Sequence, residues 1–438
     1  MSSFLIALAA GGGNVPPTMS VTRALLDRGH DVRVLADPVL EPDVRAAGAR
    51  FVPWTTAPHR LDHDPESDLA RDWEARTPMG SMARSIEGYM CGPAMAYADD
   101  VRAELEREPA DAAAGEMLTF GTMIGARGAG VPCAILSATW LSLRHWGEPP
   151  FGLGLPPASG AIGRVRERAA WAISERLWDR GRPAVNAARA AHGLAPVRHI
   201  EAQMADVDRV IVLSTMALAY PGFAPPPHVH VTGARLEDPA WATEPVALPA
   251  GEAPLVLVGL TTTFQDHASA TQRIADALGT LPVRGLITTG PALDPASVAA
   301  PPNVAVVPAA PHAELLPRAA AMITHAGHGT LVKALAAGVP FVAMPFGRDQ
   351  NELAARAARI GAAVTVRSGA RPPRIAAAVR RVLEEPAHRE AAGRAARTIA
   401  SELREDRAAD VLEELAADGR PEPARPGPNA RRPSTATG

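Results

Sequence analysis

The sequence predicts an α/β architecture in which two doubly wound domains face each other across a cleft. Short apolar runs alternate with helical segments along most of the chain, a rhythm typical of parallel sheets covered by helices on both faces. The rhythm occurs twice, on either side of a Pro-rich stretch with little periodicity. With 438 residues, the chain is long enough for two domains that each have a core.

The first domain is expected to span residues 1–235. It opens with the apolar run FLIALAA, a helix from about Thr18 to Arg28, and the strand DVRVLA. Further buried strands are expected in DAAAGEM, VPCAIL and RVIVLS, and the last strand in HVHVTGA. FLIALAA resembles the core of a secretory signal. It lacks a basic start, however, and the strand-turn-helix pattern continues through it, which favours a first buried strand.

The second domain is expected to span residues 254–400, after a Pro-rich linker at residues 236–253. Its expected strands are PLVLVGL, VRGLITTG, NVAVVPA, AAMITHAG and PFVAMPF, with helices in TQRIADALGTL, LVKALAAG and QNELAARAARIG. We expect residues 401–419 to form a C-terminal helix that packs back on the first domain. The low-complexity segment 420–438 is expected to be a disordered tail.

Composition excludes several classes of function. The formal net charge of −3 predicts no nucleic-acid partner. No apolar run approaches the roughly 18 residues of a membrane span, so we expect no membrane insertion and a cytoplasmic location. Cys91 and Cys133 lack the spacing of a metal site or a disulfide framework.

A glycine-rich loop in the second domain has the features of an anion site. THAGHGT follows the apolar run AAMI and precedes the helix LVKALAAG. Its glycines permit close approach of a ligand, and the start of the helix offers free N–H groups at the positive end of the dipole. The residues concerned are His325, Gly327, His328, Gly329 and Thr330. The pattern suits a diphosphate, although a plain strand-to-helix turn would have the same spacing.

Asp349 and Gln350 follow the strand in PFVAMPF. A carboxylate beside an amide can accept hydrogen bonds from sugar hydroxyls and donate to them. Asp349 would also suit the N-cap of the next helix, and both roles are compatible.

Several ordered motifs together resemble the GT-B glycosyltransferases of family 1, especially the actinobacterial natural-product type. The motifs are RALLDRGHDVRVLADP, VLVGLTTTFQD, PHAELLPRAAAMITHAGHGT, LVKALAAGVP and PFGRDQNELAAR. The resemblance implies two Rossmann-like domains, with the acceptor bound by the first and a nucleotide-sugar donor bound by the second.

The resemblance also implies the roles of residues in the donor site. Thr262 would lie near the diphosphate, and His325 would reach a phosphate oxygen. Gly327, Gly329 and Thr330 would line the diphosphate, with His328 beside them. Ala310 would offer backbone groups to the pyrimidine base, just before His312. Asp349 and Gln350 would face the sugar hydroxyls.

Two positions depart from the pattern of the family. Lys333 stands where UDP-sugar members often carry a Glu that binds ribose hydroxyls, which favours a dTDP-sugar over a UDP-sugar. Ala309 stands where many members carry an aromatic residue that stacks on the base. Stacking must therefore come from elsewhere or be weaker.

The loop GGGNVPP, residues 11–17, is not a dinucleotide fingerprint, because Pro16 occupies the place of its third glycine. In the resembling enzymes this loop faces the acceptor and often contains Gly-His-X-X-Pro, with His as general base. Here Asn14 occupies the place of the His, and an amide cannot take a proton at neutral pH. Asn14 would orient an acceptor hydroxyl or a water, or else cap the helix.

Glu116, at the end of DAAAGEM, is the candidate general base. The family usually has at this place an Asp that supports the His. Partial burial would raise the pKa of a carboxyl group and make it a better base. The alternative is a charge near a helix start with no catalytic role.

Two segments rich in aromatic residues, His and Pro are expected to form an apolar acceptor pocket. The candidates are Trp54, His59, Trp140, His145, Trp146 and Phe151. For each of them, an ordinary place in a core or loop is the alternative. His59 and His63, with two nearby Asp residues, are too loosely spaced to predict a metal site.

These inferences predict an inverting glycosyltransferase that moves a sugar from dTDP or UDP to a hydrophobic small molecule, such as a polyketide, macrolide or phenolic. No cofactor or metal is expected beyond the nucleotide-sugar co-substrate. A catalytically silent homologue that binds a nucleotide or supports a partner enzyme stays open, as does a sugar-nucleotide epimerase. The sequence does not decide between a monomer and a homodimer.

Overall fold

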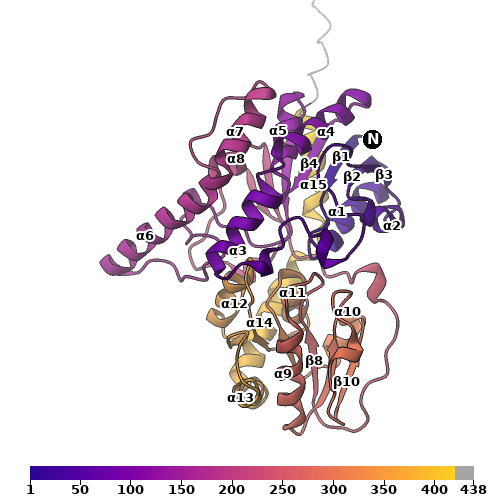
Figure 1. The fold of residues 1–438 in the computed structure, drawn as a ribbon, viewed down its shortest axis with the longest axis vertical. Coiled ribbons are helices and arrows are strands. Elements are labelled where there is room, and N and C mark those ends of the chain that lie inside the picture. The colour runs from indigo at the N-terminus through magenta and orange to yellow at the C-terminus, as the bar shows by residue number, and fades with distance from the viewer. Residues whose placement is uncertain (420–438) are drawn as a thin grey trace, which may run out of the picture.

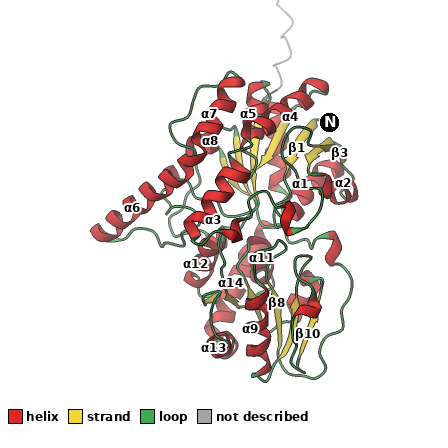
Figure 2. Cartoon of the chain, viewed as in Figure 1, coloured by secondary structure: helices red, strands yellow, loops and turns green. Residues whose placement is uncertain are grey.

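The computed structural model describes residues 1–419, apart from the side chain of His145, so the expected tail at 420–438 lies outside the described residues. Two parallel sheets, each covered by helices, lie one above the other along the long axis of the molecule (Figure 1; Figure 2). The predicted doubly wound α/β fold is confirmed.

The first sheet has seven parallel strands, and its strand order reverses between β1 and β4. In sheet order the strands are β3 (Arg50–Pro53), β2 (Asp31–Ala36), β1 (Ser3–Leu8), β4 (Ala112–Glu116), β5 (Cys133–Ser137), β6 (Arg209–Val212) and β7 (Val229–Val231). The helices of this half are α1 (Val15–Asp27), α2 (Glu41–Ala46), α3 (Pro78–Ser85), α4 (Ala94–Arg107), α5 (Phe120–Gly128), α6 (Gly160–Trp178), α7 (Arg182–Ala191) and α8 (Glu201–Ala205). We call this half the first domain.

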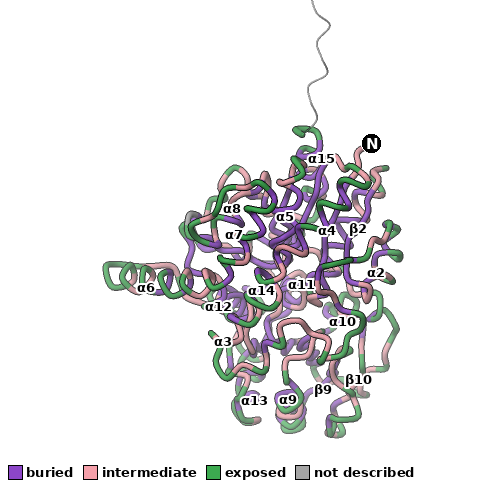
Figure 3. The backbone as a smooth tube through the Cα atoms, turned by 45° about the horizontal axis from the view of Figure 1, so that its top comes forward, coloured by how far each residue is buried: buried purple, intermediate pink, exposed green. Residues whose placement is uncertain are grey.

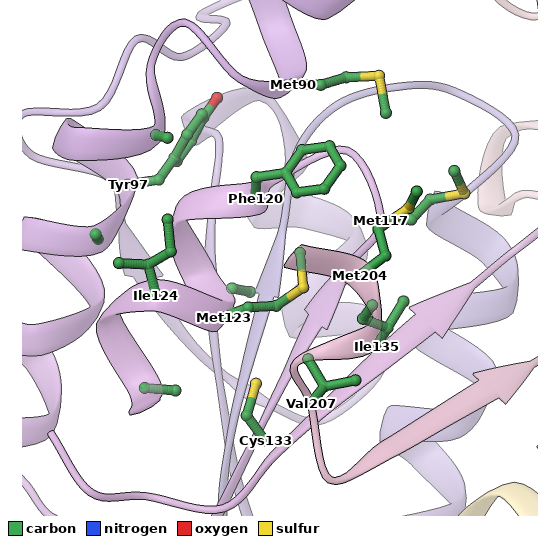
Figure 4. Close-up of a cluster of buried hydrophobic side chains, with 14 of the residues drawn as sticks. Met90, Tyr97, Met117, Phe120, Met123, Ile124, Cys133, Ile135, Met204 and Val207 are labelled. Atoms are coloured by element: carbon green, nitrogen blue, oxygen red, sulfur yellow. The ribbon is translucent and has the colours of Figure 1, made fainter. Parts of the chain in front are cut away.

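Strand β1 shows why the apolar runs of the sequence are continuous. Leu5 and Ala7 belong to the core on one face of the sheet, whereas Phe4, Ile6 and Leu8 belong to the core on the other face. Successive side chains of a strand point to opposite faces, so a strand covered on both sides needs apolar residues at every position. Figure 4 shows the side chains of the first of these cores, and Figure 3 shows the buried strands within an exposed shell.

The second sheet has six parallel strands, and its order reverses between β8 and β11. In sheet order the strands are β10 (Val304–Val307), β9 (Arg284–Thr288), β8 (Leu255–Gly259), β11 (Ala321–Thr324), β12 (Phe341–Ala343) and β13 (Ala363–Thr365). The helices of this half, the second domain, are α9 (Ala268–Gly279), α10 (His312–Leu315), α11 (His328–Ala336), α12 (Gln350–Arg359), α13 (Pro372–Glu384) and α14 (Pro386–Glu402).

The last helix, α15 (Arg407–Asp418), returns to the first domain (Figure 1). Ala408 and Leu412 lie in the core that also contains residues of β1 and β2. Arg28, just after α1, bonds Asp410 and Glu413 of α15, both at 2.7 Å. The C-terminal part of the chain therefore ties the two halves together.

A buried ionic network also joins the domains. Arg356 of α12 is fully buried and donates to Glu352 at 2.7 Å and to Glu148, from the loop after β5, at 3.2 Å. Trp140 donates its indole N–H to Glu148 at 2.8 Å, and the Arg356 guanidinium lies 4.7 Å from the centre of its ring. Buried charges persist only where partners satisfy them, so this cluster fixes the packing of α12 against the first domain.

Within residues 1–419, no helix combines the length and the apolar character that crossing a bilayer demands.

Candidate active site

The points at which the two strand orders reverse place four loops at one cavity. Ligands of doubly wound sheets bind at such points, outside the carboxyl ends of the strands. The loops after β1 and β4 face the loops after β8 and β11 across a cavity of about 700 Å³. We call it the interdomain cavity, because residues of both domains line it.

The glycine loop after β1 touches the second domain. Gly12 has a φ of +85°, and a methyl group on it would lie 2.7 Å from Thr263 and 2.8 Å from the Thr262 hydroxyl. The preceding turn is held by Asp37, at the end of β2, whose carboxylate accepts the N–H of Ala10 at 3.0 Å. Thr262 thus lies in the cavity opposite Asn14, with no room for a side chain at Gly12 between the domains.

We expect Gly12→Ala to lower kcat/KM for the nucleotide sugar about 10- to 100-fold, because the added methyl group pushes the two loops apart and strains the backbone. Gly13→Ala is the matched control, since its methyl group would meet no atom within 4 Å. Steady-state kinetics of both variants test this. Equal values would show that contact between the loops does not matter.

Asn14 and Glu116 both line the interdomain cavity and are both buried. The Asn14 side-chain amide donates to the Ala9 carbonyl at 2.9 Å and does not cap α1. Its Oδ1 atom is buried and has no hydrogen-bond partner. The Asn14 side chain is thus fixed at the wall of the cavity by its hydrogen bond to the Ala9 carbonyl.

The surroundings of Glu116 raise the pKa of its carboxyl group, which suits a general base. Burial raises its pKa to about 8, against hydrogen bonds from the Leu118 N–H and the Asn14 side chain that favour the charged form. The Leu118 N–H donates to Glu116 at 2.9 Å. A carboxylate with a pKa in this range takes a proton far more readily than an exposed one.

The loop after β11 lies across the cavity from Glu116. Ala326 has a φ of +65°, Gly327 is the N-cap of α11, and a methyl group on Gly327 would lie 2.2 Å from the His325 Nε2 atom. The glycine therefore makes room for the imidazole. Gly329 and Thr330, in the first turn of α11, line the cavity, and this helix start carries free N–H groups.

The imidazole of His325 is neutral. Burial, then the positive charge of Arg348, lowers its pKa to about 3. Its buried Nδ1 atom has no hydrogen-bond partner. His325 can therefore donate or accept a hydrogen bond at a ligand, but it brings no positive charge.

The side chain of His328 was expected to face the diphosphate, but it bonds a residue of the first domain instead. Its Nε2 atom lies 2.9 Å from the Ser214 hydroxyl, in the loop after β6 of the first domain, and burial lowers its pKa to about 4. His328 also lines the cavity. Its imidazole is engaged between the domains, which leaves its backbone N–H as the group at the helix start.

Asp349 and Gln350 line the cavity, but other groups already bind their side chains. Asp349 accepts from the Thr139 hydroxyl at 2.6 Å across the domain boundary and makes no N-cap bond. Burial raises its pKa. Gln350 accepts from the Phe346 N–H at 2.7 Å and donates to Gln265 at 2.9 Å. Asp349 keeps one carboxylate oxygen for a sugar, whereas Gln350 shapes the loop.

Ala310 and His312 do not line the cavity. His312 bonds the Thr288 hydroxyl at 3.0 Å, and a methyl group on Gly259 would lie 2.5 Å from its ring. His312 is therefore packed under the end of β8, as a buried part of the domain, and burial lowers its pKa to about 4.

Among the acceptor candidates, Phe151 lines the cavity, next to Met79, Met82 and Leu177. Trp54, Trp140 and Trp146 differ from the expectation, because each is more than nine-tenths buried in a core and none lines the cavity.

Of the two histidines proposed for the acceptor pocket, His59 alone has a described side chain. His59 bonds the Ala57 carbonyl at 2.8 Å and does not line the cavity. His145 belongs to the short helix Arg144–Trp146, but its side chain lies outside the described part of the chain.

Arg348 and Tyr89 also line the cavity, and neither was predicted from the sequence. Arg348 has a φ of +55° and pairs across the domain boundary with Asp72 at 2.8 and 2.9 Å. Tyr89 lies in the π-helical turn Ile86–Met90, and its buried hydroxyl has no hydrogen-bond partner. Arg348 directly precedes the Asp-Gln pair, which is the signal that could have indicated it. No sequence signal marks Tyr89.

Two domains built on parallel sheets, which face each other across a cavity, have the architecture of the GT-B glycosyltransferases. Comparison with known proteins supports this class. Residues 272–415 match the model of the C-terminal domain of the erythromycin biosynthesis protein CIII-like family.

The 4'-demethylrebeccamycin synthase of Lentzea aerocolonigenes is 30% identical, over 89% of this chain and 94% of its own length. The crystal structure of the calicheamicin glycosyltransferase CalG4 has a TM-score of 0.73 at 23% identity, covering 96% of this chain and 100% of that one. The structure of the glycosyltransferase VinC in complex with dTDP has a TM-score of 0.66 at 20% identity, covering 95% and 99%.

The chain belongs to the family of actinobacterial natural-product glycosyltransferases.

Proposed function

We propose that the protein is an inverting hexosyltransferase that moves a sugar from a dTDP-sugar to a hydroxyl group of a hydrophobic small molecule. One observation carries the proposal: Glu116, with its pKa raised to about 8, shares one cavity with the free helix start at Gly327–Thr330. A base and an anion site on opposite walls leave room between them for an acceptor hydroxyl and an anomeric carbon.

The arrangement supports in-line displacement. The acceptor oxygen attacks the anomeric carbon from the side of Asn14 and Glu116, and Glu116 takes its proton. The bond to the diphosphate breaks through a transition state that resembles an oxocarbenium ion. The start of α11 and the neutral His325 donate hydrogen bonds to the departing diphosphate, and the free oxygen of Asp349 accepts from a sugar hydroxyl.

The donor is proposed to be a dTDP-sugar. Lys333 donates to Asp238 at 2.5 Å, and the same Asp238 side chain accepts the Ala313 N–H at 2.9 Å. The carboxylate paired with Lys333 is thus already engaged and does not offer itself to a ribose 2'-hydroxyl. The related structure of VinC contains dTDP.

The acceptor is proposed to be a polyketide, macrolide or phenolic compound. The acceptor side of the cavity is lined by the thioethers of Met79, Met82 and Met90, with Phe151 and Trp178 beside them. Methionine-rich walls adapt to irregular apolar shapes. We further propose that transfer needs no divalent metal, because the helix start and hydrogen-bond donors receive the diphosphate. Chelation with EDTA should then leave the rate unchanged.

The pH dependence follows from Glu116. The pKa of Glu116 is raised to about 8, and only its deprotonated form can act as a base. Below pH 8, kcat/KM should therefore rise about tenfold per pH unit, and above pH 8 it should level off. A pH profile with a single donor and acceptor checks this. A flat profile between pH 6 and 8 would contradict the role of Glu116.

Mass spectrometry of products tests the function. The protein is incubated with dTDP- and UDP-forms of the same sugars and with a panel of phenols and macrolides. Glycosylated acceptors with inverted anomeric configuration, formed faster from the dTDP-sugar, are the expected products. Donor binding without turnover would indicate a silent homologue, and an altered sugar nucleotide in the absence of acceptor would indicate an epimerase.

A further inference from the structure

Every Arg and Lys side chain that lines the interdomain cavity already forms an ion pair with a carboxylate. Arg60 lies 3.6 Å from Asp68, Arg235 lies 2.5 Å from Asp406, and Lys333 lies 2.5 Å from Asp238. The fourth, Arg348, is bound by Asp72. A nucleoside diphosphate would bring at least two negative charges into this cavity. A bound diphosphate would therefore meet a cation either by sharing it with its carboxylate or by taking the place of that carboxylate.

Arg348 is the cation best placed for the diphosphate. Its charge is the second cause, after burial, that lowers the pKa of His325, so the guanidinium acts on the loop at residues 324–330. Its Nη1 atom donates to the Thr263 hydroxyl at 2.9 Å, beside Thr262 at the glycine loop. Its backbone is left-handed at a φ of +55°, a strain that persists where the surroundings hold the residue in place.

The partner of Arg348 belongs to the first domain. Asp72 begins the short helix Asp72–Glu74 and accepts two hydrogen bonds from Arg348, at 2.8 and 2.9 Å. The next residue, Trp73, packs edge-on against Phe264 of the second domain, with ring centres 5.2 Å apart. Asp72 holds the guanidinium by the same two-pronged geometry that a phosphate offers.

We propose that Arg348 is the cation that neutralises the departing diphosphate, and that Asp72 holds it in position until the nucleotide binds. The inference rests on the proposed function. As the acceptor oxygen bonds to the anomeric carbon, the bond from this carbon to the diphosphate oxygen breaks. Its electron pair goes to that oxygen, the acceptor proton goes to Glu116, and Arg348 donates to the oxygen that gains charge.

Nucleotide binding separates this role from a structural one. The affinities of dTDP and of thymidine, which has no phosphate, are measured by isothermal titration calorimetry for the wild type, Arg348→Gln and Asp72→Asn. Arg348→Gln should weaken dTDP binding on the order of 10- to 100-fold, with thymidine binding unchanged. Asp72→Asn should tighten dTDP binding severalfold, because Arg348 no longer has to leave a carboxylate.

The decisive result is that the two substitutions change the affinity for dTDP in opposite directions. If the pair served only to join the domains, both substitutions would weaken dTDP binding alike, and that outcome overturns the proposal. Wild-type affinity in Arg348→Gln, or no tightening in Asp72→Asn, overturns it as well. Arg381→Gln is the matched control, since Arg381 forms an exposed ion pair with Glu385 at 3.1 Å and does not line the cavity.

Two further measurements keep the test independent of folding and of the proposed function. Thermal melting shows whether each variant is folded, and Arg348→Lys, which keeps the charge but loses the two-pronged geometry, should bind dTDP with intermediate affinity. If the wild type binds dTDP but transfers no sugar, the proposed function fails and the assignment of Arg348 to the diphosphate is still tested. If the wild type binds no dTDP, both fail.

Discussion

Glu116→Gln is expected to slow sugar transfer by at least about 100-fold, the usual scale of general base catalysis. Gln keeps the size of the side chain and can still accept the N–H of Leu118, but it cannot take a proton from the acceptor. Asn14 cannot replace it, because an amide does not take up a proton at neutral pH. Single-turnover transfer at saturating donor measures the effect.

Glu402→Gln is the matched control for this prediction. Burial raises the pKa of Glu402 too, but its side chain accepts the Met216 N–H at 2.9 Å and does not line the cavity, so its replacement should leave transfer near the wild-type rate. Equal rates for the two variants would remove Glu116 from the mechanism.

The stability of Glu116→Gln shows whether a slower transfer comes from loss of the base or from loss of the fold. The folded protein holds a proton on Glu116 up to a pKa of about 8, whereas the unfolded chain releases it near 4.5. The stability of the wild type therefore falls as the pH rises through this window. Glu116→Gln removes that loss and should be no less stable than the wild type at pH 8.

Arg356→Met should lower the free energy of unfolding by about 3–5 kcal/mol, because it leaves the buried carboxylates of Glu352 and Glu148 without their cation. Both lie within the domain interface, so the loss also loosens α12 from the first domain. Urea unfolding at pH 7, followed by tryptophan fluorescence, measures the effect.

Arg45→Met is the control for this prediction. Arg45 pairs with Glu41 at 2.6 Å on the surface, and removal of an exposed pair should change stability by less than about 1 kcal/mol. A similar small loss for Arg356→Met would show that the buried network does not hold the domains together.

The sheets were predictable because most strands lie within short apolar runs bounded by turn residues. FLIALAA became β1 and PLVLVGL became β8, since a strand buried on both faces leaves no alternation to misread. Strands β3 and β13 escaped prediction, because they have only four and three residues and part of each is exposed. So short a segment has no periodicity to recognise.

The loops of the site were predictable for a topological reason, whereas several side chains were not. Strand ends in parallel sheets share one edge, which is why Asn14, Glu116 and the loop at residues 324–330 line one cavity. The burial of Trp140 could not be predicted in this way. Its neighbour Arg356 is 216 positions further along the sequence, and no local pattern indicates that Trp140 belongs to a buried ionic cluster.

In the proposed mechanism, the helix start at Gly327–Thr330 binds a diphosphate across the cavity from Glu116. A crystal structure with dTDP bound tests it most directly. We expect phosphate oxygens within hydrogen-bond distance of the backbone N–H groups at residues 328–330, with Glu116 on the opposite wall. A nucleotide seated against the glycine loop of the first domain, with no phosphate at α11, would contradict it.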